Sequence, residues 1–543
     1  MQTQTAIQPD QAYDLLVVGG GINGVGIARD ACGRGLKVLL CEQHDLAQHT
    51  SSASTKLIHG GLRYLEYYEF KLVRKALQER EVLMRLAPHI ISPLRFVMPH
   101  DKSQRPAWMI RIGLFMYDHL ARREFLPGSQ GIRFDTHEAG APLQSGYRRG
   151  FVYSDGWVDD ARLVVLNAMD AAARGARILT RTRCMSAQRS NGVWQAQLQQ
   201  ADGSEIAVTA RAIVNAAGPW AAQFAGSVAA SGEKTSALRL IKGSHIVVPR
   251  LFEHAYAYIF QNPDKRIIFA IPYQDEFTLI GTTDLEYQGD PAKVGIDQDE
   301  IDYLCQASSR YFKRAITPDQ VVWTYSGVRP LLDDESENAS AITRDYVLEV
   351  DVGKVEAADG STAAPLLNVW GGKITTYRKL AEEAMALLLP HLQEGKAAPD
   401  WTDRAYLPGG DLQDSGAMVE RYDVAAFVQG MAAKYPWLPA KLCTRYAHNY
   451  GTRSKLLLHG ANCLADLGRE LCPGLYEAEA RYLCQYEWAQ TEDDILWRRS
   501  KLGLWAKAEH VAALREWLQL QAQATASNAP APDALASDAK EHP

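Results

Sequence analysis

A glycine-rich turn between an apolar strand and a helix is the feature that most constrains what this chain can fold into. Gly19, Gly21 and Gly24 form the pattern G-x-G-x-x-G directly after the apolar segment 14–18, and a helical pattern follows. Gly19 allows the tight turn, Gly21 lets the backbone approach a pyrophosphate, and Gly24 allows close helix packing. The next strand ends at Glu42, eighteen positions after Gly24, where an acidic side chain can bind the adenosine ribose. The pattern predicts a Rossmann-like βαβ unit that binds a dinucleotide.

The glycine motif alone does not separate NAD from FAD, because both present the same adenosine diphosphate half to the protein. A dense run of hydroxyls and glycines, TSSASTKLIHGGLRYLE, begins at Thr50, where FAD needs donors along its pyrophosphate and ribityl chain. Two later turns, IVNAAGPW at 213–220 and WGGKITTYR at 370–378, fit the same expectation. Together these segments favour FAD. The predicted cofactor-binding residues are Gly19, Gly21, Gly24, Glu42, Thr50, Ser51, Ser52, Ser54, His59, Gly60, Gly61, Ala217, Gly218, Trp220, Gly372, Lys373 and Thr375.

We expect FAD to be held noncovalently. Covalent attachment usually engages His, Cys or Tyr, and the spacing leaves attachment to His49 or His59 as the alternative.

Composition limits the partners of the chain. The formal net charge is -6, so no overall basic field attracts nucleic acid, and an anionic ligand must be held by a local cluster. The eight cysteines show no zinc-site spacing, so we predict reduced thiols and no metal site. The N-terminal MQTQTAIQPDQAYD does not resemble a secretory signal, and we expect the protein to fold in the cytoplasm. No apolar run reaches the roughly 18 to 20 residues that span a bilayer, so we expect any membrane contact to be peripheral.

The chain is long enough for two to four domains, and its patterns predict an α/β fold followed by a helical part. Segments rich in β-forming residues between 239 and 284 indicate an antiparallel sheet in a separate layer, and the pattern from about 408 to 520 is helical. We expect a discontinuous FAD-binding domain (10–85, 150–235 and 325–392), a substrate-binding or cap domain (86–149 and 236–324), a C-terminal all-helical domain (400–520), and disordered tails (1–9 and 521–543).

The motifs, read in order, resemble those of the FAD-dependent glycerol-3-phosphate dehydrogenases, within the larger group of D-amino-acid-oxidase-like flavoproteins. They include GGGINGVGIARDA, TSSASTKLIHGGLRYLE, YSDGWVDDARL, RLIKGSHIVVPR, WTYSGVRPL, AITRDY and WGGKITTYRKLAE, and the resemblance covers nearly everything except the two termini. It is closest to the bacterial aerobic, quinone-reducing enzymes. It implies oxidation of sn-glycerol 3-phosphate to dihydroxyacetone phosphate by hydride transfer from C2 to flavin N5, with electrons passed to a membrane quinone. It also implies peripheral binding to the inner face of the cytoplasmic membrane. The C-terminal domain is expected to cap the cleft or to mediate a homodimer.

The same resemblance places a set of cationic residues around the substrate. A buried phosphate dianion needs several cations or backbone donors, and the planar fork of arginine suits it best. His245 is the leading candidate for the general base, because an ordinary histidine pKa of about 6.5 suits a proton acceptor near neutrality. Lys373 or Arg329 could instead stabilise the developing alkoxide, and a water could take the proton. The predicted substrate-binding residues are Arg63, Tyr64, His245, Arg329, Arg344 and Lys373, with His245, Arg329 and Lys373 as the catalytic candidates.

Residues 105–123, RPAWMIRIGLFMYDHLARR, combine large apolar side chains with arginines. Such a stretch is more often a core helix, and on sequence alone we favour that interpretation. The alternative hypothesis is an apolar face that docks into one membrane leaflet and reaches a quinone.

Three other functions compete with a quinone-linked dehydrogenase. The nearest is a soluble oxidase of the same fold that makes hydrogen peroxide from glycerol phosphate, an amino acid or a 2-hydroxy acid. An RNA-associated flavoprotein shares the opening motif, but the acidic balance counts against it. A non-catalytic flavoprotein with an interaction module is the third, and a turnover assay separates it from an enzyme.

Overall fold

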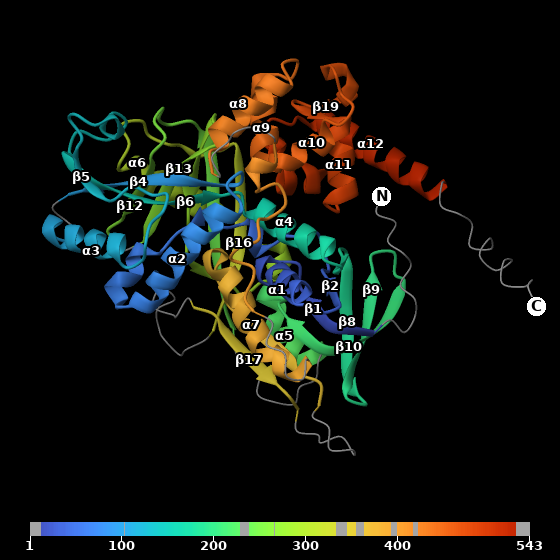
Figure 1. Cartoon of the computed structure of the whole chain (residues 1–543). Coiled ribbons are helices and arrows are strands. Elements are labelled where there is room, and N and C mark those ends of the chain that lie inside the picture. The colour runs from blue at the N-terminus through green and yellow to red at the C-terminus, as the bar shows by residue number, and fades with distance from the viewer. Residues whose placement is uncertain are drawn as a thin grey trace, which may run out of the picture. The chain divides into compact units, whose positions relative to one another are not determined.

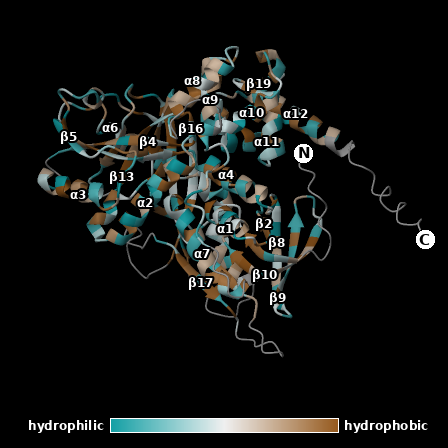
Figure 2. Cartoon of the chain, viewed as in Figure 1, coloured by the Kyte–Doolittle hydropathy of each residue, from teal (hydrophilic) through white to brown (hydrophobic). Residues whose placement is uncertain are grey.

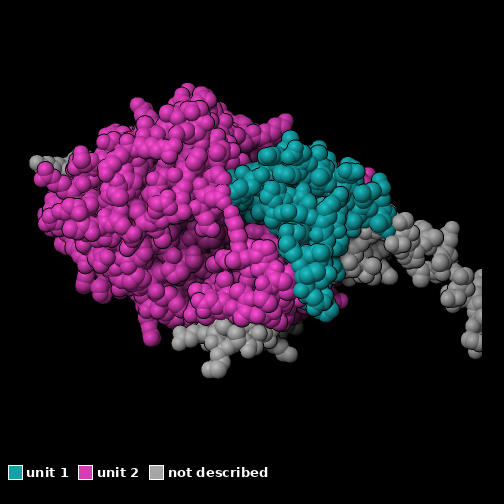
Figure 3. Space-filling view, turned by 90° about the horizontal axis from the view of Figure 1, so that it is seen from above, with its two compact units in different colours: residues 1–2, 456–543 teal, residues 3–455 magenta. Residues whose placement is uncertain are grey.

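The computed structural model describes residues 12–527 apart from 102–103, 229–237, 265, 333–344, 354–362, 393–398 and 416–421. Arg344, one of the predicted substrate-binding residues, therefore lies outside the described residues. The chain divides into two compact units, one of residues 3–455 and one of residues 1–2 and 456–543 (Figure 3). Residues 400–455, assigned above to the C-terminal domain, belong to the first unit. The domain boundaries themselves stay a prediction.

An eight-stranded sheet in the first unit contains the predicted dinucleotide-binding motif. Its order is β17 (Val347–Asp351), β18 (Leu366–Trp370), β10 (Glu205–Asn215), β1 (Ala12–Val18), β2 (Val38–Cys41) and β7 (Arg177–Leu179), with β8 (Thr182–Ser190) and β9 (Val193–Gln200) added beside β10. β1 lies parallel to both β2 and β10, and β10 lies parallel to β18. The run 15–17 is completely buried, as expected of a parallel strand covered on both faces. The predicted βαβ unit is confirmed.

Three helices pack beside these strands (Figure 1). α1 (Ile22–Gly33) packs against both α4 (Asp160–Ala173) and α7 (Tyr377–Leu392). A Cβ at Gly26 of α1 would come within 2.8 Å of the Tyr377 ring, so the two helices approach closely there. The short α5 (Ala221–Gln223) follows β10.

The second sheet of the first unit has ten strands. Its order is β15 (Leu285–Glu286), β11 (Leu238–Pro249), β14 (Phe277–Gly281), β13 (Ile267–Tyr273), β12 (Ala257–Gln261), β4 (Ile91–His100), β6 (Arg149–Val158) and β3 (Leu57–Ile58), with β16 (Trp323–Leu332) paired to β11 and β5 (Gln130–Arg133) to β6. The antiparallel sheet predicted for 239–284 is confirmed as its centre. β3, β6 and β16 come from segments assigned above to the FAD-binding domain, because strand periodicity does not identify the sheet that a strand joins.

Helices flank the second sheet as well. α6 (Gln298–Ser309) contacts β11, β13 and β14, and α2 (Phe70–Leu86) contacts β4 and β6. α2 is the amphipathic helix expected between 65 and 86, but it begins later than expected. Residues 62–67 form a separate 3₁₀ helix, η2 (Leu62–Tyr67), and the following Tyr68 has a φ of 59°.

The segment predicted to be a core helix is exposed, so that prediction was wrong. α3 (Ala107–His119) buries only Leu114 and Tyr117. The exposed fractions are 64% for Trp108 and 56% for Phe115, and Figure 2 shows hydrophobic residues in brown on this helix. Its composition resembles a core helix, but nothing in the described part of the chain covers its outer face.

The C-terminal part is largely helical, as predicted. α8 (Val424–Lys434) and α9 (Ala440–Tyr450) belong to the first unit, α10 (Ser454–Leu457) follows them, and the second unit contains α11 (Glu477–Tyr486), a π-helical turn (Asp494–Arg499) and α12 (Ala508–Ser527). Two features differ from the prediction. One is a short hairpin of β19 (Glu470–Cys472) and β20 (Leu475–Tyr476). The other is that residues 521–527, which were expected to be disordered, are helical. No helix among the described residues is long and apolar enough to cross a membrane.

Candidate functional site

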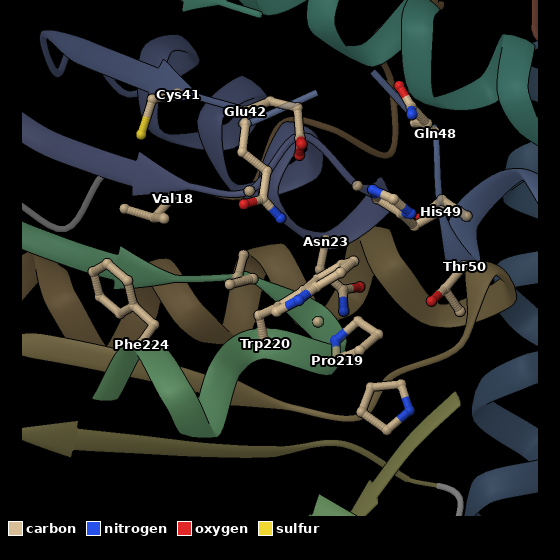
Figure 4. A pocket seen from close by; sticks show the side chains of 18 of the residues that line it. Val18, Asn23, Cys41, Glu42, Gln48, His49, Thr50, Pro219, Trp220 and Phe224 are labelled. Atoms are coloured by element: carbon tan, nitrogen blue, oxygen red, sulfur yellow. The ribbon is translucent and has the colours of Figure 1, made fainter. Parts of the chain in front are cut away.

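A cavity of about 390 Å³ opens where β1, β2 and β10 end. Ligands of open α/β sheets bind at the carboxyl ends of the strands, so this is the expected place for a dinucleotide. In Figure 4, Val18, Cys41 and Glu42 from the strands face Trp220 and Phe224 from the segment after β10. The predicted cofactor-binding residues that line the cavity are Gly19, Gly21, Glu42, Thr50, Ser51, Ala217, Gly218, Trp220 and Gly372.

The glycine turn presents the N-terminus of α1 to this cavity. Gly19 has a φ of 115°, which favours glycine, and a Cβ there would lie 2.4 Å from the carbonyl oxygen of Ala216. A Cβ at Gly24 would lie 1.9 Å from the carbonyl oxygen of Gly19, so only glycine allows α1 to pass this close to the turn. Gly21 caps α1 without a side-chain hydrogen bond, and the N–H of the next residue donates to Ser51 Oγ at 3.0 Å. Such an N-terminus favours an anionic group, which fits a pyrophosphate.

Glu42 is anchored to the glycine turn. Its buried carboxylate accepts hydrogen bonds from the N–H of Gly20 at 2.6 Å and of His44 at 2.8 Å. Burial raises the pKa of Glu42, and these two backbone donors oppose the rise. A carboxylate has more acceptor sites than these two bonds use, so Glu42 can also accept from a ribose hydroxyl. The residues of the cavity therefore fit the adenosine and pyrophosphate of a dinucleotide.

An aromatic group borders the same cavity. The rings of His49 and Trp220 meet edge to face at 4.7 Å, and His49 Nε2 lies 2.9 Å from His44 Nδ1. Both side chains line the cavity, as do Thr50 and Pro219 (Figure 4).

Most of the hydroxyl run is hydrogen-bonded within the protein. Thr50 Oγ1 donates to the carbonyl of Val328 at 2.6 Å, and Ser54 Oγ donates to Asp160 at 2.7 Å. Ser52 Oγ donates to the carbonyl of His49 at 3.3 Å. Ser52 and Ser54 do not line the cavity, so their hydrogen bonds fix the loop rather than contact the space beside α1.

A buried ion pair in this loop was missed in the sequence analysis. Lys56 Nζ lies 2.7 Å from Asp160 at the start of α4 and donates to the carbonyl of Ser52 at 3.1 Å. The ammonium also lies 5.0 Å from the ring centroid of Tyr325. The sequence offered one sign of this pair, a single lysine inside a motif of hydroxyl, apolar and glycine residues. It did not identify the partner, because Asp160 lies 104 positions away.

The turn at 59–64 and the turn at 371–375 meet. The N–H of His59 donates to Thr375 Oγ1 at 3.3 Å, and Lys373 Nζ lies 3.9 Å from the ring centroid of Tyr64. Gly61, with a φ of 77°, leaves room for the Tyr64 ring. The residues brought together here are His59, Gly60, Gly61, Tyr64, Lys373 and Thr375, and Arg63 is half-buried in the same turn.

Hydrogen bonds to a residue of α3 and to Asp155 fix the turn at 59–64. The N–H of Gly60 donates to Tyr117 Oη at 2.9 Å and to Asp155 Oδ1 at 3.2 Å. Tyr117 Oη donates to Asp155 at 2.7 Å, and Arg80 pairs with the same carboxylate at 2.7 Å. Tyr117 belongs to α3, so the exposed helix is bonded directly to the predicted flavin-contacting turn.

His245 is buried near two ion-paired cations, Lys56 with its partner Asp160 and Arg329 with its partner Asp284. Its Nε2 lies 3.0 Å from Thr55 Oγ1, and its ring stacks on Tyr325 with centroids 4.7 Å apart. Burial lowers the pKa of His245 well below its usual value, and the charges of Lys56 and Arg329 lower it further. The near-neutral pKa assumed from the sequence was therefore wrong for the free protein. Nδ1 makes no hydrogen bond to any described residue.

The guanidinium of Arg329 lies beside Asp284 and Thr283. Its Nη1 lies 3.3 Å from Asp284, and its Nη2 donates to the carbonyl of Thr283 at 3.4 Å, both long bonds. Its side chain is 31% exposed, and a Cβ at Gly243 would lie 2.4 Å from Nη2, so glycine is needed there. The described residues contain no cluster of three or more His, Cys, Asp or Glu placed to hold a metal ion.

Comparisons with known proteins agree with this geometry. Residues 14–378 match the family of FAD dependent oxidoreductases, and residues 401–528 match the C-terminal domain of alpha-glycerophosphate oxidase. The chain is 56% identical to glycerol-3-phosphate dehydrogenase of Pseudomonas aeruginosa, over 94% of this chain and 95% of that one. It is 51% identical to aerobic glycerol-3-phosphate dehydrogenase of Escherichia coli (94% and 97%) and 50% identical to D-erythritol 1-phosphate dehydrogenase of Brucella abortus (93% and 98%). Its structure resembles glycerol-3-phosphate dehydrogenase of Bacillus halodurans complexed with FAD, with a TM-score of 0.72, 25% identity, and coverage of 95% of this chain and 90% of that one.

Proposed function

The chain belongs to the family of FAD-dependent glycerol-3-phosphate dehydrogenases, and on this premise we propose that it oxidises sn-glycerol 3-phosphate to dihydroxyacetone phosphate. Family membership confirms the fold class, the FAD cofactor and the enzyme class predicted from the sequence. The observation that carries the substrate proposal is the buried imidazole of His245, which stacks on Tyr325 and lies on β11, the strand paired with the strand of Arg329. This is an environment that favours an anion next to a neutral proton acceptor.

The cofactor is held by the first cavity. The N-terminus of α1 and the turn at Gly19 and Gly21 accommodate the pyrophosphate, and Glu42 accepts from the ribose. When bound, FAD supplies the acceptor for the hydride that leaves C2 of the substrate.

The cationic side chains bind the phosphate. The planar guanidinium of Arg329 can bond two phosphate oxygens at once, and the half-buried Arg63 makes no hydrogen bond or ion pair with any described residue. Lys373 stands over the Tyr64 ring in the neighbouring turn. A dianion is stabilised by several such groups, whereas a single carboxylate needs only one cationic clamp. Arg344 completes the proposed set from outside the described residues.

His245 accepts the proton of the C2 hydroxyl. If Nε2–H donates to Thr55, the unpaired Nδ1 is the acceptor. The charges of Lys56 and Arg329 make the imidazole a weak base in the free protein. A bound phosphate dianion neutralises this field and raises the pKa of His245, so substrate binding itself prepares the base.

The electrons pass to a quinone at a membrane surface that α3 contacts. α3 and η2 contact each other, and each carries exposed large apolar side chains, among them Trp108 and Phe115 on α3 and Tyr67 on η2. A helix of this kind lies in the interface of one leaflet without crossing it. The hydrogen bond from Gly60 to Tyr117 links this surface to the flavin-contacting turn. The location is the inner face of the cytoplasmic membrane.

D-erythritol 1-phosphate is the second candidate substrate, because the Brucella abortus enzyme is as similar to this chain as the Escherichia coli enzyme. Initial rates with a soluble quinone analogue compare the two substrates directly. We expect the higher kcat/KM with sn-glycerol 3-phosphate, and a higher value with D-erythritol 1-phosphate would reverse the assignment. The same assay under air measures hydrogen peroxide, which a soluble oxidase would make at the rate of substrate oxidation.

A further inference from the structure

A second cavity, of about 630 Å³, lies between α2 and the C-terminal end of α3. It is separate from the dinucleotide cavity and shares no lining residue with it. The side chains around it come from α2, from the end of α3 and from the loop that follows, and they are Arg74, Gln78, Asp118, His119, Leu120, Ala121, Arg122, Arg123 and Leu126.

The cavity is basic, against the overall acidic balance of the chain. Arg74 and Arg122 are exposed, and neither forms a hydrogen bond or ion pair with any described residue. Arg123 pairs with Asp118 at 3.0 Å. Asp118 also accepts from the N–H and the hydroxyl of Ser129 at 2.8 and 2.6 Å, so its charge is satisfied within the protein. Two guanidinium groups therefore remain available to an anion.

An exposed apolar stripe leads directly to this cavity. Trp108, Ile112 and Phe115 lie at successive helical spacings on α3, with exposed fractions of 64%, 51% and 56%. The ring of Phe115 lies 4.1 Å from that of His119, which lines the cavity. An anionic group in the cavity would thus be continuous with an apolar surface.

We propose that this cavity binds the phosphate headgroup of an anionic phospholipid, whose acyl chains lie along the apolar stripe of α3. The inference rests on the membrane contact proposed above and names the lipid that this contact selects. A phosphodiester matches the planar fork of arginine, and its attached chains match the neighbouring Trp108, Ile112 and Phe115. Neither feature alone requires a lipid, but a headgroup site that continues into an apolar stripe fits a molecule with one charged end and one apolar end.

The test is vesicle binding by the full-length, FAD-loaded protein. Vesicles of phosphatidylcholine alone are compared with vesicles that contain about 30 mol% phosphatidylglycerol, at an ionic strength of about 0.15 M. The test variant is the double substitution Arg74→Gln and Arg122→Gln. The control is Arg310→Gln and Arg314→Gln, which removes the same charge from exposed arginines of another region.

We expect the wild-type protein and the control to prefer the anionic vesicles to the same extent. Each basic residue at such a surface contributes about a fivefold factor, so the test variant should lose about 25-fold in partition onto anionic vesicles and little on neutral ones. Flavin content and the rate with a soluble quinone analogue should be unchanged in both variants, because these arginines lie outside the proposed catalytic site. The two measurements are independent. The rate with the soluble quinone analogue tests whether the protein oxidises glycerol 3-phosphate, and the partition onto vesicles tests whether the cavity binds lipid.

Two results would overturn the proposal. Equal losses in the test variant and the control would mean that net charge, and not this cavity, selects anionic vesicles. Calorimetric binding of inorganic phosphate or glycerol 3-phosphate, abolished in the test variant, would assign the cavity to a small soluble anion instead of a lipid.

Discussion

Replacing Arg329 tests the proposed phosphate site most sharply. In Arg329→Gln the side chain keeps a polar end but loses its charge. Hydrogen bonds to charged groups contribute about 1.5–3 kcal/mol, which corresponds to a factor of about 10 to 150 in affinity. Because the side chain is 31% exposed, solvent screening places the expected effect toward the lower end. The KM for sn-glycerol 3-phosphate should therefore rise at least about tenfold.

The assay compares a phosphorylated and an unphosphorylated substrate. Reduction of the bound flavin by glycerol at high concentration lacks the phosphate contact, so its rate should change little in the variant. Arg266→Gln is the matched control: Arg266 pairs with Asp264 at 3.7 Å and has a side chain that is 40% exposed. An unchanged KM for glycerol 3-phosphate, or an equal loss with glycerol, would refute the phosphate role.

The same variant has a second readout through His245. Arg329 lowers the pKa of His245, so its removal should raise that pKa. Since the neutral imidazole is the proposed base, the loss of kcat/KM on acidification should begin at a higher pH than in the wild type. A purely structural role for Arg329 would leave the pH profile where it is.

Three further predictions follow from the surroundings of single residues. Gly24→Ala should abolish FAD retention, because the added Cβ would lie 1.9 Å from the carbonyl oxygen of Gly19. The flavin content of the purified protein measures this. The control is Gly113→Ala, because a Cβ added at Gly113 has no heavy atom within 4 Å. Tyr117→Phe removes the hydroxyl that donates to Asp155 and accepts from Gly60, and should reduce the free energy of unfolding by about 1–3 kcal/mol, seen as a lower Tm; an unchanged Tm would contradict the role of this bond. Burial lowers the pKa of His89 to about 3, against about 6.5 in the unfolded chain, so the unfolded state binds the proton first as pH falls. Between pH 6.5 and 5 the wild type should therefore lose about 2 kcal/mol of stability that His89→Gln does not lose, and parallel pH dependence of the two denaturation midpoints would refute this.

The local chemistry of the dinucleotide site could be predicted from the sequence because its determinants are close together in the chain. A tight turn, a helix N-terminus and an acidic residue at the end of the next strand lie between Gly19 and Glu42, and each has its own steric or electrostatic requirement. The alternation of apolar residues likewise predicted the antiparallel sheet around β11 and β14.

The remaining features depend on neighbours that periodicity does not identify. The pKa of His245 is set by Lys56 and Arg329, which are distant from it in sequence. The partner of Lys56 is an aspartate 104 positions away. The apolar residues of α3 have the composition of a core helix, and only the arrangement of the other elements shows that just two of them, Leu114 and Tyr117, are buried.

Anaerobic reduction of the bound flavin shows whether sn-glycerol 3-phosphate is the electron donor of this protein. The purified, FAD-loaded protein is mixed with sn-glycerol 3-phosphate in the absence of oxygen while the flavin absorbance is followed, and a soluble quinone analogue or oxygen is then added. We expect rapid bleaching by the substrate, fast recovery of colour with the quinone and slow recovery with oxygen. A fully loaded flavin that stays oxidised in the presence of the substrate would contradict the assigned reaction, and rapid recovery with oxygen would make the protein an oxidase.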